Sequence, residues 1–169
     1  MNLNDTDFVL FGVPATFAQD RGALDTRWKE LQREAHPDRF AAQGGAAQRL
    51  AMQWSVRINE AYQRLKNPIK RATYLCQLNG APIRAETNTA MPAAFLMQQM
   101  AWREELDDAQ DPAAFEKLRV EVEAARARAL SSLDWLIDEK GDYAEAARQV
   151  RALMFIERFA EDIEAKVDQ

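Results

Sequence analysis

Apolar residues recur at helical spacing on both sides of the tripeptide His36-Pro37-Asp38. The first apolar stripe consists of Leu24, Trp28, Leu31 and Ala35, and the second of Leu50, Trp54, Ile58, Ala61 and Leu65. Stripes with this period predict two amphipathic helices that bury their apolar faces. Proline lacks a backbone donor and disfavours a helical conformation of the residue before it, so we expect Pro37 to end the first helix. The pattern therefore predicts a helical hairpin with His36 and Asp38 exposed in its connection.

Two short segments flank this hairpin. The apolar run 8–14 could be a strand or a helical lead-in, and the lack of any other strand-like segment favours the helix. Asn67-Pro68 is a cap and first-turn pair that predicts another short helix, and Asn79-Gly80 is a typical helix stop. We therefore expect a compact N-terminal domain of four helices over residues 1–78.

Helical periodicity disappears over residues 79–92, which are rich in Gly, Pro, Asn and Thr and are predicted to be a linker. Residues 93–169 then predict three helices: one over 93–109, one that begins at Asp111-Pro112, and one that follows Gly141. The predicted seam of the second helix is Phe115, Leu118, Val122, Ala125, Ala129, Leu133 and Leu136. That of the third helix is Val150, Leu153, Ile156, Ala160, Ile163 and Val167. The chain is thus predicted to be all-α, with a C-terminal three-helix bundle.

Charge is divided unevenly between these two parts. The net charge is −5, but residues 1–78 carry a net +3 and residues 79–169 a net −8. This split fits two modules with different partners. An acidic chain is also a poor candidate for nucleic-acid binding, which needs a concentrated basic surface.

Several classes of protein are disfavoured by composition. No apolar run approaches the length that spans a membrane, and the N-terminal residues lack a basic or apolar signal region, so we expect a cytosolic protein. Cys76 is the single cysteine, which excludes a disulfide framework and a cysteine-clustered metal site. Its apolar neighbours predict a small buried side chain. We expect no metal site and no cofactor.

The helix predicted over 93–109 has two unlike faces. Phe95, Trp102 and Leu106 share the face that can enter the core. The opposite face carries Met97, Met100, Glu104 and Asp108, with Leu96 at its edge. Phe155 on the last helix lies roughly opposite the seam of that helix. These residues either form an adaptable apolar patch with an acidic rim that grips another protein, or are ordinary surface and partly buried positions.

The hairpin resembles a J domain, the module that stimulates ATP hydrolysis by DnaK-type chaperones. The resemblance rests on His36-Pro37-Asp38 after a helix with outward basic residues, and on the run Ile58-Asn-Glu-Ala-Tyr62 in the next helix. It implies a chaperone-binding surface made of His36, Pro37, Asp38, Lys29, Arg33 and Arg39.

Two further segments resemble the HscB co-chaperones, which pair a J domain with a three-helix domain that holds the iron–sulfur scaffold protein IscU. They are Phe11-Gly-Val-Pro14 and Ala94-Phe-Leu-Met-Gln-Gln-Met-Ala-Trp-Arg-Glu-Glu-Leu-Asp-Asp108. The resemblance covers essentially the whole chain. It implies a co-chaperone that binds IscU and delivers it to the DnaK-type chaperone HscA, stimulating its ATPase for iron–sulfur cluster maturation. The family's scaffold contacts fall here on Leu96, Met97, Met100, Ala101, Glu104, Asp108 and Phe155.

The chain departs from these families at several positions. Ala35 replaces the aromatic residue common before His-Pro-Asp, and Ala101 stands where a glutamate is frequent. Glu30 and Glu34 occupy positions that are often basic in general-purpose J domains, which favours a dedicated partner. The two-cysteine metal-binding extension of some eukaryotic relatives is absent, so the resemblance is to the bacterial type.

Three alternatives to this reading are open. An enzyme could use His36 as a general base or metal ligand beside Asp38, but no second histidine, nucleophilic cysteine or glycine-rich phosphate loop accompanies them. A helical nucleic-acid binder is possible in principle because helix-turn-helix proteins also join two helices by a turn. The acidic balance counts against it. The third alternative is a J-domain protein that serves a client other than IscU.

Overall fold

The computed structural model describes residues 1–169 and contains helices but no strands, which confirms the predicted all-α class. Internal contacts divide the chain into two compact units, Met1–Tyr74 and Leu75–Gln169. The division falls inside α4 (Pro68–Leu78), whereas the sequence predicted the boundary in the linker 79–92. The domain bounds 1–78, 79–92 and 93–169 stay a prediction. None of the helices is both long and apolar enough to cross a membrane.

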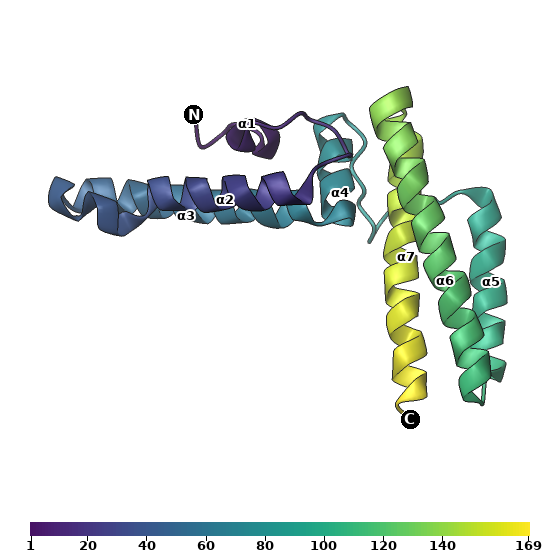
Figure 1. Cartoon of the computed structure of the whole chain (residues 1–169). Coiled ribbons are helices and arrows are strands. Elements are labelled where there is room, and N and C mark those ends of the chain that lie inside the picture. The colour runs from purple at the N-terminus through teal and green to yellow at the C-terminus, as the bar shows by residue number, and fades with distance from the viewer. The chain divides into compact units, whose positions relative to one another are not determined.

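The first unit is built on the predicted hairpin. Figure 1 shows α2 (Arg21–Ala35) lying along α3 (Gly45–Lys66), with the 3₁₀-helix η1 (Pro37–Gln43) in the connection between them. The prediction that the apolar stripes are buried is confirmed at Leu24, Leu31, Ile58, Ala61 and Leu65. Thr26, Lys29 and Arg33 are exposed, as predicted.

The predicted burial of the second apolar stripe was wrong at its first residue. Leu50 is 50% exposed, although its spacing placed it on the buried face of α3. It lies near the connection, where it lines a cavity together with the small side chains of Ala35 and Ala47. Periodicity identifies the face of a helix but not whether the opposing residues are large enough to cover it.

The ends of these helices follow local signals. The Asp20 side chain accepts a hydrogen bond from the backbone N–H of Ala23 and begins α2. The Asn67 side chain accepts from the backbone N–H groups of Ile69 and Lys70, which confirms it as the cap of α4. The chain leaves α4 at Gly80, whose φ of 79° suits glycine.

The apolar run near the N-terminus is the short helix α1 (Asp7–Phe11), and its Phe8, Leu10 and Phe11 are buried. The carboxylate of Asp7 is fully buried and pairs with two arginines of α3, Arg64 at 2.6 Å and Arg57 at 2.8 Å. Because a buried carboxylate needs compensation, these arginines fix where α1 docks on α3.

The second unit contains the three predicted helices, α5 (Ala93–Asp108), α6 (Pro112–Asp134) and α7 (Tyr143–Val167), which Figure 1 shows side by side. Every predicted seam residue of α6 is buried, including Leu136 in the π-helical extension η2 (Trp135–Lys140). On α7 the seam holds at Val150, Leu153, Ile156 and Ile163, but Val167 in the last turn is 37% exposed. The prediction also missed Phe159, which is completely buried.

The segment that joins α4 to α5 is packed against α7. The buried side chain of Arg151 donates hydrogen bonds to the carbonyls of Ile83 and Ala90, each at 3.0 Å. Ile83 itself is buried. Cys76 is also fully buried, and burial raises the pKa of its thiol to about 11. The expected role of Cys76 as a small apolar residue is therefore confirmed.

Candidate functional site

The connection of the hairpin presents His36 and Asp38 to solvent. The His36 side chain is 57% exposed and that of Asp38 is 91% exposed. His36 is extended (φ −62°, ψ 128°) and Pro37 takes the first position of η1, so proline directs the chain away from α2. The loop is thus held by the two helical elements on either side of it.

The ring of His36 is oriented by its own loop. Its Nδ1 accepts a hydrogen bond from the backbone N–H of Asp38 at 3.2 Å. A nitrogen that accepts carries no proton, so the neutral ring holds its proton on Nε2. That N–H remains available as a donor to a partner, next to the Asp38 carboxylate as an acceptor.

Basic side chains lie on the α2 side of this loop. Lys29 and Arg33 are four residues apart, so they share one face of α2, and both are exposed. The guanidinium of Arg39 donates to the carbonyl of Arg33 at 3.3 Å and so lies against the last turn of α2. The structure therefore brings Lys29, Arg33 and Arg39 to the same end of the hairpin as His36, Pro37 and Asp38. We call these six residues the loop site.

A set of polar contacts holds α2 in place on α3. The Trp28 indole N–H donates to the side chain of Asn59 at 2.9 Å, and the Gln32 amide donates to the same oxygen at 2.8 Å. The Ser55 hydroxyl donates to Gln32 at 2.7 Å. The Trp28 ring also stacks on Tyr62, with centroids 4.7 Å apart. Sequence reasoning did not single out these supports, although Asn59 and Tyr62 belong to the run 58–62 that carried the resemblance.

A second feature of the hairpin is the pairing of Asp25 with Tyr62 and Arg21. The Tyr62 hydroxyl donates to the Asp25 carboxylate, and the Arg21 guanidinium donates to the same oxygen at 2.9 Å. These two donors hold the pKa of Asp25 below its ordinary value, with Tyr62 as the larger cause. The same hydrogen bond raises the pKa of the Tyr62 hydroxyl. The contact ties the middle of α2 to α3.

In the second unit, α5 exposes the face that sequence analysis singled out. Met97 is 71% exposed, Met100 is 64% exposed and Leu96 is about half exposed. Ala101, Glu104 and Asp108 on the same helix are exposed as well. On the other side, Trp102 and Leu106 are buried. We call Leu96, Met97, Met100, Ala101, Glu104 and Asp108 the methionine patch.

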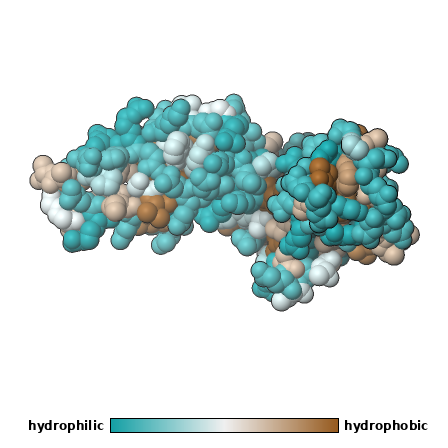
Figure 2. All heavy atoms as spheres, turned by 90° about the horizontal axis from the view of Figure 1, so that it is seen from below, coloured by the Kyte–Doolittle hydropathy of each residue, from teal (hydrophilic) through white to brown (hydrophobic).

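Twelve large apolar residues of this protein are exposed, and three of them, Leu96, Met97 and Met100, lie within five residues of one helix. The face seen in Figure 2 is mostly hydrophilic, with apolar residues in small groups. Methionine side chains are flexible and polarizable, and they adapt well to the surface of a partner. Apolar residues with an acidic rim have the composition of a protein-binding surface.

Two contacts from α7 position α5. Arg103 pairs with Asp162 at 2.9 Å. Near the end of α5, the Lys166 ammonium donates to the carbonyls of Leu106 and Asp107 in the last turn. The Leu106 carbonyl also accepts from the backbone N–H of Ala109 at 3.3 Å. The methionine patch therefore stands on a helix that is fixed at its C-terminal half.

Phe155, the remaining predicted scaffold contact, is partly exposed and belongs to an aromatic cluster between α5 and α7. Its ring meets that of Phe95 edge-on at 5.7 Å and stacks on Phe159 at 5.9 Å. The Arg103 guanidinium lies 5.5 Å from the Phe155 ring. Phe155 thus supports the packing of α5, whatever else it contacts.

Neither unit contains a group of three or more His, Cys, Asp or Glu side chains that could hold a metal ion. The geometry of both surfaces suits contacts with other proteins, because each is exposed and stands on helices that are held by buried residues. The loop site combines three basic side chains with the Asp38 carboxylate, and the methionine patch combines apolar side chains with two carboxylates.

Comparison with known proteins identifies the family. A Bordetella parapertussis protein named co-chaperone protein HscB homolog is 51% identical over 162 residues, which cover 95% of each chain. This chain belongs to the HscB co-chaperone family. An HscB homolog of Burkholderia multivorans is 48% identical over 172 residues and covers 100% of this chain and 98% of its own.

Solved structures of HscB proteins share the fold. Chaperone HscB from Vibrio cholerae is 35% identical, with a TM-score of 0.81 over 98% of this chain and 99% of its own. The human co-chaperone protein HscB is 26% identical, with a TM-score of 0.87 over 98% of this chain and 84% of its own. A family model described as the HSCB C-terminal oligomerisation domain matches residues 91–164. This HscB family member therefore has an N-terminal J domain joined to a C-terminal helical domain.

Proposed function

We propose that this protein binds the iron–sulfur scaffold protein IscU and delivers it to the DnaK-type chaperone HscA, whose ATPase it stimulates for iron–sulfur cluster maturation. In this proposal the protein is not itself an enzyme, because the chemistry takes place at the nucleotide site of the chaperone. The proposal includes a cytosolic location. It combines family membership with the two surfaces described above.

The loop site would contact the chaperone. The exposed Asp38 carboxylate can accept a charge-assisted hydrogen bond from an arginine, and His36 can donate through Nε2. Lys29, Arg33 and Arg39 can meet acidic groups on the partner. For this contact to speed hydrolysis, the loop must bind the hydrolysis-competent state of the chaperone more tightly than its other states.

The methionine patch would hold the scaffold protein. Met97 and Met100 supply apolar contact area, and Glu104 and Asp108 supply charges that select a partner with basic groups nearby. Phe155 is the remaining proposed contact. Because Ala101 stands at a position where the family often has glutamate, one acidic contact is missing from this version of the surface.

The observation that carries the proposal is the exposure of His36 and Asp38 in a loop whose two flanking helices are tied together. His36→Gln removes the imidazole and should abolish stimulation of the HscA ATPase in a single-turnover assay. Binding of IscU, measured by calorimetry, should stay at the wild-type level. Lys70→Gln changes an exposed residue of α4 outside the loop site and serves as the control. Undiminished stimulation by His36→Gln would refute the role of the loop.

A further inference from the structure

The sulfur atoms of this chain differ in how far they are open to solvent. Six methionines and one cysteine supply them. Cys76 is fully buried, and burial raises the pKa of its thiol to about 11, so at neutral pH it is not the thiolate that oxidants attack. The sulfur that this protein offers to an oxidant is therefore the thioether of its exposed methionines.

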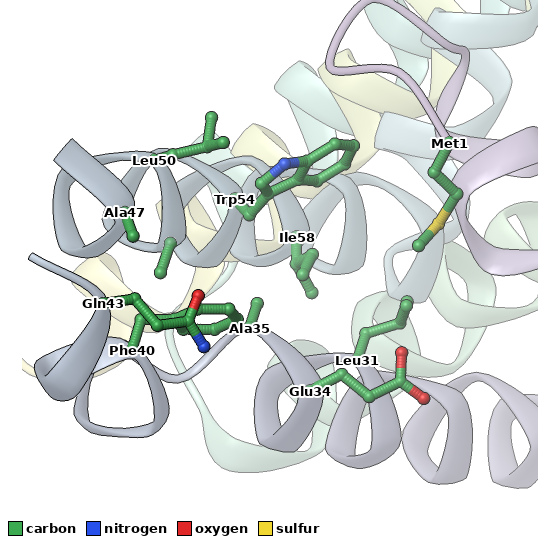
Figure 3. Close-up of a pocket in the computed structure, with 11 residues that line it drawn as sticks. Met1, Leu31, Glu34, Ala35, Phe40, Gln43, Ala47, Leu50, Trp54 and Ile58 are labelled. Carbon is green, nitrogen blue, oxygen red and sulfur yellow. The ribbon is translucent and has the colours of Figure 1, made fainter.

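Four methionines are exposed, and two of these lie together. Met1 lines the cavity of the hairpin (Figure 3) and Met52 lies on α3, so both belong to the first unit. Met97 and Met100 are three residues apart on α5, which makes their side chains neighbours on one face of that helix. The methionine patch thus has two open thioethers side by side.

Oxidation changes the chemical character of Met97. A peroxide transfers one oxygen atom to the sulfur, which is oxidised by two electrons, and the peroxide is reduced and leaves as water. The resulting sulfoxide is polar, and its oxygen accepts hydrogen bonds. The side chains three and four residues away from Met97 contain no hydrogen-bond donor, since they are Ala93, Ala94, Met100 and Ala101. The new oxygen is therefore satisfied only by water, and its burial against a partner costs free energy.

The surroundings of Met100 lead to the same result. Arg103 is the one donor within a helical turn of it, and Asp162 already pairs with this guanidinium at 2.9 Å. The carboxylates of Glu104 and Asp108 accept hydrogen bonds but do not donate them when ionised. Along α5 the patch therefore supplies no free donor to a sulfoxide at this position.

We propose that Met97 and Met100 form a reversible oxidation site, at which a peroxide converts the thioethers to sulfoxides and so weakens binding of a partner to the methionine patch. The inference rests on the scaffold binding proposed above. A methionine sulfoxide reductase restores the patch: a dithiol supplies two electrons and two protons, and the oxygen leaves as water. Because a bound partner covers both sulfurs, oxidation acts on the free protein.

The order of oxidation tests the site itself. After treatment of the full-length protein with hydrogen peroxide, peptide mass spectrometry locates the sulfoxides. Met97 and Met100 should be oxidised before Met91 and Met154, which are half-buried. The sulfur of Met91 also accepts a hydrogen bond from the Gln99 amide at 2.9 Å. Equal rates at all four positions would overturn the proposal.

Protection by the partner is a second readout of the same experiment. Saturating IscU should slow the oxidation of Met97 and Met100. It should leave the oxidation of Met52 unchanged, because that exposed methionine lies on α3 and outside both proposed surfaces. Protection of Met52 to the same degree would mean that IscU only consumes the peroxide, and would count against the proposal.

Calorimetry then measures the effect on binding after the peroxide has been removed. The oxidised protein should bind IscU about tenfold or more weakly than the untreated protein, and treatment with the reductase should restore the affinity. Met97→Leu with Met100→Leu keeps apolar side chains that cannot take up oxygen, so its own affinity should change less than about twofold on treatment. Met52→Leu is the matched control and should lose affinity on treatment as the wild type does.

The outcomes separate this inference from the function on which it rests. Wild-type affinity of a protein that carries both sulfoxides would overturn the oxidation site alone. A loss of affinity in the treated leucine double variant as large as that in the wild type would also overturn it. If the untreated protein does not bind IscU, the proposed scaffold binding is refuted, and the inference with it.

Discussion

The imidazole of His36 is oriented by a single backbone contact. The Asp38 N–H occupies Nδ1, so the ring presents Nε2–H beside the exposed Asp38 carboxylate. The His36 donor and the Asp38 acceptor thereby lie next to each other within one tripeptide. In the proposed contact with the chaperone, the tripeptide supplies this donor and acceptor, and the rest of the hairpin holds them in place.

The buried carboxylate of Asp7 should be a critical residue for the stability of the first unit. Asp7→Asn removes the charge that Arg57 and Arg64 compensate and leaves both arginines without an anionic partner. Removing one member of a buried ion pair costs about 3–5 kcal/mol, so we expect the free energy of unfolding to fall by that amount. Urea denaturation followed by circular dichroism measures it.

Glu34→Gln on the exposed side of α2 is the matched control for that experiment, because it also neutralises one carboxylate. It should change the free energy of unfolding by less than about 0.5 kcal/mol. An Asp7→Asn effect as small as that of the control would mean that α1 docks on α3 through its apolar residues alone.

The Asp25 carboxylate predicts a pH dependence of hairpin stability. Its pKa is lowered in the folded state by the Tyr62 hydroxyl and by Arg21, from an ordinary value of 3.8. The contribution is therefore present above that ordinary value and is lost as the pH falls through the lower folded pKa. Tyr62→Phe deletes the main donor, so its urea midpoint should lie below that of the wild type at pH 7.

The difference between Tyr62→Phe and the wild type should then shrink when both are measured near pH 3. Asp25→Asn serves as a second reference, since it has no carboxyl group to titrate at this position. A difference that is the same at both pH values would show that Tyr62 stabilises the hairpin through its ring, which stacks on Trp28, and not through its hydroxyl.

At the scale of elements, α5 combines the proposed binding face with a face that packs in the core. Mutations on the first face should change scaffold binding without changing stability. Met97→Ala with Met100→Ala truncates exposed side chains, so the melting temperature should not change. Scaffold binding should weaken by about 2 kcal/mol or more if these methionines anchor the interface. Calorimetry against IscU measures the change, and Val120→Ala, which truncates an exposed apolar residue of α6, is the control. Wild-type affinity of the double variant would make both methionines ordinary surface residues.

Phe155→Ala should behave differently because its ring contacts Phe95 and Phe159. The substitution removes part of the packing between α5 and α7 and should lower the free energy of unfolding by about 1–3 kcal/mol. A loss of scaffold binding in this variant therefore has to be compared with its thermal melt, which shows whether the protein is still folded. A stable Phe155→Ala protein would show that the aromatic cluster does not support α5.

The helices themselves could be predicted because their signals are local. Asn67, Asp111 and Gly141 act through hydrogen bonds or dihedral angles within a few residues, and the seam of α6 repeats over several turns. Other features depend on residues distant in the sequence. Arg151 meets carbonyls more than sixty residues away, and Phe159 is buried by partners on another helix. Neither has a periodic signature.

The candidate surfaces were predictable to a similar degree. Exposure of the loop and of Met97 and Met100 followed from the helical wheel and from Pro37. The exposure of Leu50 and the cavity beside Ala35 did not, because they depend on the volumes of side chains that face one another across the hairpin. The aromatic surroundings of Phe155 were missed for the same reason: a wheel places a residue on its own helix only.

At the scale of the whole molecule, the two proposed binding surfaces would act together because one chain carries both. The first unit has the loop site and the second has the methionine patch. A variant of either surface should therefore lose delivery of the scaffold to the chaperone while keeping the activity of the other surface. His36→Gln should still bind IscU, and Met97→Ala with Met100→Ala should still stimulate the HscA ATPase in the absence of IscU.

The most direct test mixes these two variant proteins. Delivery is measured as the amount of IscU that co-purifies with HscA after one round of ATP hydrolysis. We predict that each variant alone fails to deliver IscU and that an equimolar mixture fails as well, since no molecule in the mixture carries both intact surfaces. Delivery restored to the wild-type level by the mixture would contradict the claim that the two surfaces must be joined in one chain.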